Sequence, residues 1–442
     1  MKCPASSFLL VLALSGLALA QSPKPEDFIA KGKTFVDLMA KEDFAAANNL
    51  LDPTIQKPLS PARLAETWKS TTAQFGAYQK QLGARHESSG QFDIVFVTCQ
   101  FARTPFDFKF SFRDNGALMA VQLVLTVDPA LAHLTLPDTL QETELVVGTE
   151  EWALPATLTT PATGGPFPAV ILVHGSGPQD RDETMYSTKP FRDLAWGLAS
   201  RGVAVLRYVK RTKAYTNRLV SGKISVTLKE ETVDDAVAAV ALLRKTAGVD
   251  PKRIYVLGHS LGGTAIPRIG AADPQIHGFI VLAGTARPLE DIVLEQFTYI
   301  VSLDTSTAAD KKKAFLDKLA AQVARVKDPK LTKDSPATDL PLRLPADYWL
   351  DLRGYRPAEM AKQLKQPMLI LQGERDYQAT MDDFNLWKAA LGSRQNVTFK
   401  SYPKMNHLFI EGEGKATPAE YMKPARVSET VIDDIAAWVK QH

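Results

Sequence analysis

A serine set between two glycines is the residue of this chain that points most directly to chemistry. Ser260 lies in the motif Gly258–Gly262 (GHSLG), directly after the apolar run 254–257. A short strand, a sharp turn and a following helix form a nucleophile elbow, in which the two glycines keep Cβ atoms out of a crowded turn. The serine hydroxyl then projects above the sheet, and the N–H of Leu261 can point at a developing oxyanion.

Three further segments also follow expected strands. The motif 174–178 (HGSGP) follows a strand at 169–173, and Asp376 and His407 each follow a later buried strand. With the elbow, these segments resemble the α/β-hydrolase superfamily, and within it bacterial exported esterases that carry the HGSGP and GHSLGG pair. The resemblance covers residues from about 145 to 442, and the chain order serine, acid, histidine is the order that this fold uses.

The resemblance implies a catalytic triad of Ser260, His407 and Asp376. A serine hydroxyl is a poor nucleophile near neutral pH until a base accepts its proton. His407 would be that base, and later the acid that protonates the leaving group. Asp376 would orient His407 and stabilise the imidazolium.

Two backbone N–H groups are expected to form the oxyanion hole. Leu261 supplies one, and the HGSGP loop supplies the other, which the sequence leaves open between Gly175 and Ser176. One departure stands nearby: residues 208–211 read YVKR, where relatives often carry YDKR. Because this carboxylate is missing, the sequence leaves the geometry of the substrate rim open. The expected triad is not affected.

Several neighbouring residues compete for these roles. His259 flanks the nucleophile and is interpreted as structural, because it points away on the strand-to-helix turn. His174 is expected to brace the oxyanion loop, and Glu374 is a weaker candidate acid than Asp376. Residues 180–182 (DRD) are expected to form a salt-bridged rim, whereas the basic stretch 210–213 is interpreted as a solvated face.

The rhythm of elements predicts an α/β fold for residues 145–442. Six near-continuous apolar strands separated by helices, after an entry hairpin, predict a mostly parallel eight-stranded sheet with helices on both faces. Residues 286–365 are too long for a connection and mostly helical in pattern, so we expect a cap between strands six and seven. The expected strands are 145–147, 152–158, 169–173, 203–208, 254–257, 279–282, 368–371 and 397–402.

Residues 26–127 are expected to form a separate α+β unit, followed by a linker at 128–144. Helical spacing at 28–51 and 61–81 gives way to alternation of period two, in which four phenylalanines between 106 and 112 share one face. Residues 114–116 (DNG) predict a tight hairpin turn. In pattern and position this unit resembles the cystatin-like, nuclear-transport-factor-2-like fold found in front of some bacterial hydrolases.

The N-terminus predicts export. Lys2 precedes an apolar run at 8–19, and residues 18–20 (ALA) have the form of a cleavage site, so we expect a signal peptide at 1–20. The mature protein would be secreted or periplasmic, with no integral membrane segment. Cys99 would then be the remaining thiol, and its place in an alternating strand predicts a buried, inert side chain.

Together these patterns predict a serine hydrolase that cleaves carboxylic esters through an acyl-enzyme on Ser260. A serine peptidase or amidase on the same fold is the first alternative, with Arg287, Arg343 or Arg353 binding a peptide terminus. A catalytically silent binding module is the second. The seven histidines are scattered, so no metal or organic cofactor is expected, and a net charge of +3 gives no nucleic-acid footprint. The natural ester and the oligomeric state are left open, with a homodimer as one option.

Overall fold

The computed structural model describes residues 23–89, 92–102, 105–125, 134–186, 188–220, 226–305 and 307–442. The chain divides into two compact units between residues 126 and 127. The expected signal peptide at 1–20 lies outside the described residues. Among those described, no helix combines the length and the apolar character needed to cross a membrane.

The N-terminal unit packs helices against one antiparallel sheet in the strand order β1-β2-β3-β4. Phe106, Phe108, Phe110 and Phe112 are all buried, as their alternation predicts. Gly116 has φ +82° in the hairpin between β3 and β4. The elements are α1 (Pro25–Ala40), α2 (Phe44–Asn49), α3 (Pro53–Gln56), α4 (Pro61–Phe75), β1 (Tyr78–Ser89), β2 (Phe92–Phe101), β3 (Pro105–Arg113) and β4 (Leu118–Leu125).

Two expected helices of this unit are shorter than their apolar spacing suggests. The pattern at 28–51 contains α1 and α2, separated by a turn in which Glu42 has φ +59°. The pattern at 61–81 ends at Phe75, because Gly76 has φ +84° and leaves the helical conformation. The next residues form β1, so the sequence pattern assigned the first part of this strand, residues 78–81, to a helix.

The second unit is built on an eight-stranded sheet with the order β12-β11-β10-β9-β7-β8-β6-β5. The pairs β5–β6 and β6–β8 are antiparallel, and the other neighbours are parallel. This confirms the predicted mostly parallel sheet. The strands are β5 (Leu140–Val147), β6 (Leu154–Pro161), β7 (Phe167–Val173), β8 (Ala204–Tyr208), β9 (Val249–His259), β10 (Gly278–Leu282), β11 (Met368–Gly373) and β12 (Val397–Tyr402).

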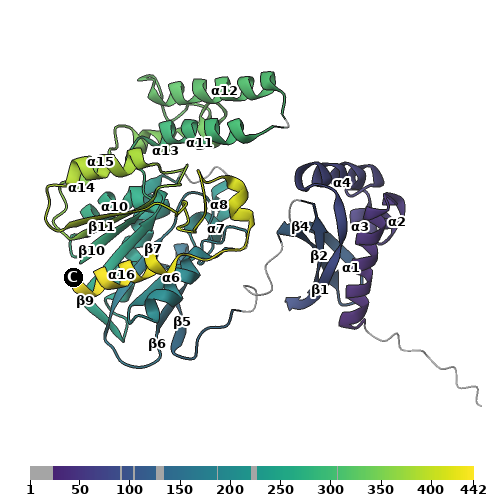
Figure 1. The fold of residues 1–442 in the computed structure, drawn as a ribbon, viewed down its shortest axis with the longest axis horizontal. Helices are drawn as coiled ribbons and strands as arrows, with labels where there is room; N and C mark the ends of the chain where they lie inside the picture. The colour runs from purple at the N-terminus through teal and green to yellow at the C-terminus, as the bar shows by residue number, and fades with distance from the viewer. Residues whose placement is uncertain are drawn as a thin grey trace, which may run out of the picture. The chain divides into compact units, whose positions relative to one another are not determined.

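Helices cover both faces of this sheet (Figure 1). One buried cluster joins the sheet to α9 (Asp234–Leu243), α10 (Leu261–Ala272) and α15 (Met381–Leu391). The opposite cluster joins it to α6 (Pro190–Ala199) and α16 (Glu429–Gln441). A sheet buried on both faces explains why the central strands are near-continuous apolar runs.

The first strand begins earlier than expected. β5 starts at Leu140, so residues 140–144 of the expected linker belong to the sheet. The polar residues of this edge strand hide it from an apolar pattern, and Glu142 and Glu144 accept hydrogen bonds from Thr159 and Thr157 of β6.

The segment between β10 and β11 has two parts. The helices α11 (Leu289–Leu303) and α12 (Ala309–Lys327) lie side by side at one end of the unit (Figure 1). In contrast, α13 (Ala346–Leu352) and α14 (Pro357–Ala361) contribute side chains to the main core. The expected cap at 286–365 therefore lies where predicted between strands six and seven, but its second half packs into the body.

Candidate active site

The elbow is built by the approach of three backbone segments. Ser260 has φ +55° and ψ −117° between β9 and α10, and its N–H donates to Leu282 O at 2.9 Å. A Cβ on Gly258 would lie 2.2 Å from Gly262 O, and one on Gly262 would lie 2.3 Å from Val173 O. Both glycines are therefore required by close backbone contacts, as the motif predicted.

The proposed acid and base meet in the structure. Asp376 Oδ2 lies 2.6 Å from His407 Nδ1, and both side chains are buried. Asp376 Oδ1 accepts the N–H groups of Gln378 at 2.7 Å and Ala379 at 3.2 Å. Glu374, the weaker candidate, instead accepts from the Ser401 hydroxyl at 2.8 Å. Because Asp376 contacts Nδ1 of the His407 ring, the Nε2 atom is not engaged by Asp376. A general base requires this arrangement.

The loop that carries His407 lies against the elbow. The rings of His259 and His407 are 4.7 Å apart, and His259 Nε2 is 3.1 Å from His407 O. His259 is the residue before Ser260, so the base and the proposed nucleophile come from adjoining segments. The buried Asn406 shapes this loop, because its side-chain oxygen accepts the N–H groups of Leu408 and Ile410.

The HGSGP loop contacts the elbow from the other side. A Cβ on Gly175 would lie 3.2 Å from Ser260 Cβ. The Gly175 N–H already donates to Glu183 Oε1 at 2.6 Å, so it is engaged away from any substrate. This favours Ser176 as the donor of this loop. Leu261 is the first residue of α10, and its N–H therefore has no intrahelical acceptor.

A buried ion pair behind the elbow was not predicted. Glu183 Oε2 lies 2.8 Å from His259 Nδ1, with both side chains almost wholly inaccessible. Burial alone would lower the pKa of His259, but the Glu183 carboxylate outweighs it and raises that pKa. Burial would raise the pKa of Glu183, yet His259 and the Gly175 N–H bring it below its usual value. The acidic residues that follow the HGSGP motif could have indicated this pair, but the expected salt-bridged rim included only residues 180–182.

His174 braces the HGSGP loop, as expected. Its Nε2 lies 2.9 Å from Asp180 O, and its ring packs on Phe191 and Tyr208. Burial, together with the positive charge of Lys210, lowers the pKa of His174 to about 4. The ring is therefore neutral near neutral pH.

The basic stretch at 210–213 was expected to be a solvated face, which is wrong for Lys210 and Arg211, whereas Lys213 is exposed. Lys210 is 1% exposed, and its Nζ donates to Gly175 O at 2.8 Å. Arg211 pairs with the buried Asp235. The sequence of this basic stretch gave no indication of burial, because the groups that accept its hydrogen bonds come from distant segments of the chain. The salt-bridged rim is present, since Arg181 pairs with Glu144 and Asp182 pairs with Arg207.

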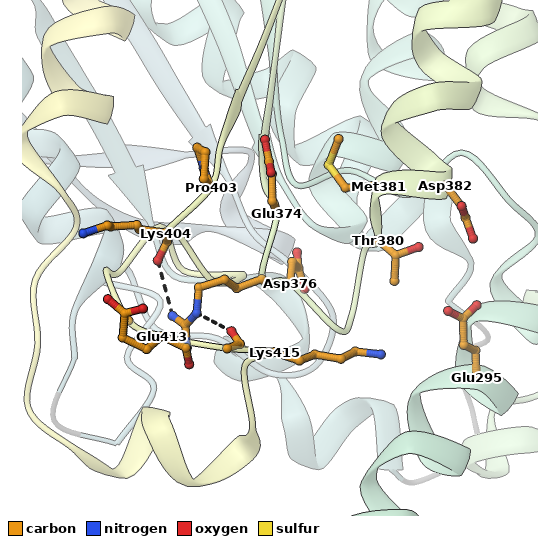
Figure 2. A pocket seen from close by; sticks show the side chains of 13 residues that line it. Glu295, Glu374, Asp376, Thr380, Met381, Asp382, Pro403, Lys404, Glu413 and Lys415 are labelled. Carbon is orange, nitrogen blue, oxygen red and sulfur yellow. Dashed lines mark hydrogen bonds between the residues drawn. The ribbon is translucent and has the colours of Figure 1, made fainter.

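A cavity of about 590 Å³ lies beside the loop that carries Asp376 (Figure 2). Acidic and basic side chains line it, including Glu295, Glu374 and Lys415, but neither Ser260 nor His407 does. Of the cap arginines, Arg287 pairs with Asp383 and Glu295, and Arg353 donates to backbone carbonyls. Within the described ranges, no group of three His, Cys, Asp or Glu side chains could hold a metal ion.

The elbow, the HGSGP loop and the acid–histidine pair after β11 and β12 together define an α/β-hydrolase. In agreement, residues 170–421 match the model of the alpha/beta hydrolase family, and the chain belongs to that family. Residues 33–120 match a family described as a protein of unknown function (DUF3887).

Among characterised relatives, esterase EstD of Thermotoga maritima is 35% identical over 407 residues, which cover 92% of this chain and 93% of the relative. Two solved structures are similar at lower identity. Est1E from Butyrivibrio proteoclasticus has a TM-score of 0.44 at 16% identity, covering 68% of this chain and 99% of that one. An esterase of Pyrococcus furiosus has a TM-score of 0.44 at 13% identity, covering 72% and 97%.

Proposed function

We propose that the protein is a serine esterase whose acyl-enzyme forms on Ser260. The hydrolysis of carboxylic esters is supported by its family and by the 35% identity to esterase EstD along nearly the whole chain. The observation that carries the proposed mechanism is the 2.6 Å contact of Asp376 with His407, on a loop that adjoins the elbow.

The proposed steps follow the chemistry of a serine, histidine and aspartate triad. His407 accepts the Ser260 proton as the hydroxyl oxygen attacks the ester carbon, and then returns a proton to the departing alcohol. Water hydrolyses the acyl-enzyme with the same assistance. The N–H groups of Ser176 and Leu261 receive the oxyanion, each contributing about 3–4 kcal/mol to the transition state.

A fluorophosphonate probe with peptide mapping tests the nucleophile. We expect the label on Ser260, and we expect Ser260→Ala to lose both the label and the turnover of a p-nitrophenyl ester. Ser200→Ala is the matched control, because the Ser200 hydroxyl donates to Trp196 O at the end of a helix. Full ester turnover by a folded Ser260→Ala variant would refute the mechanism, and an inert wild-type protein would favour a silent binding module.

Amide hydrolysis is a separate question of specificity. Arg287 and Arg353 are occupied by partners within the chain, so neither favours the grip on a peptide terminus that an exopeptidase needs. We expect a p-nitrophenyl ester to be cleaved and the matching anilide to be left intact.

We also propose that the protein is exported. The support is the sequence 1–20 alone, with its charged start, apolar run and ALA site. Terminal sequencing of the protein from an extracytoplasmic fraction should find Gln21 first, and a terminus at Met1 would contradict cleavage.

A further inference from the structure

A buried lysine holds the peptide that is expected to bind the oxyanion. Lys210 follows β8 by two residues, and its ammonium group lies between two acceptors. Nζ donates to Gly175 O at 2.8 Å and lies 3.4 Å from Glu231 Oε2. Burying an ammonium group costs free energy unless the group is paired and hydrogen-bonded. A fully buried lysine at this position therefore indicates a function.

The peptide geometry supplies that function. Gly175 O and the Ser176 N–H belong to one planar trans peptide, so they point in opposite directions. An ammonium group that fixes the carbonyl oxygen therefore fixes the direction of the N–H on the far side. We propose that Lys210 is a positioning residue that aims the Ser176 N–H at the oxyanion, an inference that rests on the proposed esterase mechanism.

The positive charge of Lys210 also acts on the peptide that joins Gly175 to Ser176. A cation at the carbonyl oxygen polarises the peptide and makes its N–H a stronger donor, by the cooperativity of hydrogen-bonded chains. The lysine does so from behind the loop and without touching the substrate. It is in place before the reaction begins, so no reorganisation is needed as charge develops.

Glu183 fixes the preceding peptide of the loop. The Gly175 N–H donates to Glu183 Oε1, while the Gly175 carbonyl accepts from Lys210. Gly175 is thus held at both of its backbone polar groups by buried side chains of opposite charge. This double clamp leaves the Ser176 N–H as the oriented donor of the loop.

The clamp continues into the segment between β10 and β11. The Tyr348 hydroxyl on α13 donates to Glu231 Oε1 at 2.6 Å, and Glu231 Oε2 faces Lys210. A line of buried polar contacts therefore runs from α13 through Glu231 and Lys210 to the oxyanion loop. Tyr348→Phe should weaken the clamp from its far end, with a smaller effect than substitution of Lys210.

The test separates positioning from a merely structural role by comparing ground-state and transition-state binding. In Lys210→Met we expect kcat for a p-nitrophenyl ester to fall about 10- to 100-fold, less than the loss of a whole oxyanion donor, with KM within about threefold. The inhibition constant of a trifluoromethyl ketone, whose adduct carries the oxyanion, should rise by the same factor as kcat/KM falls. Lys229→Met is the matched control, because the Lys229 ammonium pairs with Asp234 at the surface.

Two further variants keep the result decisive if Lys210→Met does not fold. Lys210→Met combined with Glu231→Gln removes both buried charges together, and Lys210→Arg keeps the cation and should recover part of kcat. Unchanged kcat in a folded variant, or a rise in KM with unchanged ketone inhibition, would overturn the inference. Failure of the esterase mechanism would look different, because wild-type protein would then lack turnover or Ser260→Ala would retain it.

Discussion

Two buried histidines near Ser260 have pKa values displaced in opposite directions, and their partners explain why. His259 faces the Glu183 carboxylate at 2.8 Å, which favours its charged form despite burial. His174 faces a backbone carbonyl and lies near the ammonium group of Lys210, so burial prevails and its neutral form is favoured. The site therefore places two imidazoles with oppositely displaced pKa values next to Ser260 and its neighbouring loop.

The low pKa of His174 predicts a loss of stability in acid. Its folded pKa of about 4 lies below the unfolded value, so the unfolded chain binds more protons between pH 6.5 and 4. The free energy of unfolding should fall as the pH drops through this window, by roughly 3 kcal/mol from this group at 1.4 kcal/mol per unit. Urea unfolding at pH 7 and 4.5 should show a smaller acid loss for His174→Gln than for wild type, and equal losses would contradict the assignment.

Removing the charge of Glu183 should change both stability and the titration of His259. In Glu183→Gln the pKa of His259 should fall, because burial remains while the carboxylate that opposes it is gone. Breaking a buried pair from one side should destabilise the fold by about 3 kcal/mol. Nitrogen NMR of the imidazole measures the first effect and urea unfolding the second. An unchanged His259 titration would exclude Glu183 as its partner.

At the scale of the element, the elbow brings backbone atoms of neighbouring segments into close contact. No movement of a side chain can make room there. In Gly258→Ala the new Cβ would lie 2.2 Å from Gly262 O, and neither strand β9 nor helix α10 can move without displacing Ser260. We expect at least about 3 kcal/mol of destabilisation, at the upper end of the cost of overpacking, and loss of ester turnover. Gly83→Ala is the control, because no atom lies within 4 Å of its Cβ position. A Gly258→Ala variant with full stability and turnover would contradict the close approach of backbone at this turn.

The elements that the sequence predicted well are those with a local signal. The elbow glycines, the central strands and the residues after β11 and β12 follow from spacing, so Ser260, Asp376 and His407 could be named in advance as candidates. Lys210 and Glu183 could not, because their burial depends on acceptors at Gly175, Glu231 and His259, far away in the chain. β5 was predicted too short because its residues 141–144 are polar, so an apolar pattern does not detect its first half.

At the scale of the whole molecule, the buried polar contacts of the site lie within one unit. The triad candidates, the HGSGP loop, the Glu183–His259 pair and the contacts of Lys210 all belong to residues 174–407. The N-terminal unit has its own apolar core, in which Cys99 is buried and its thiol pKa is raised to about 12 by burial and nearby carboxylates. That thiol is inert near neutral pH, as its place in the strand predicted.

This division predicts that the second unit folds and reacts without the first. A protein beginning at residue 134 keeps β5 whole, together with both core clusters of the sheet. Since domains fold as units, we expect cooperative unfolding and a kcat/KM for a p-nitrophenyl ester within about threefold of the full chain. Starting at residue 145 instead would remove most of β5 and should lower stability.

Light scattering of the longer fragment and of the full chain would show whether the N-terminal unit makes a dimer. A folded fragment from residue 134 that lacks turnover would instead give the N-terminal unit a part in catalysis.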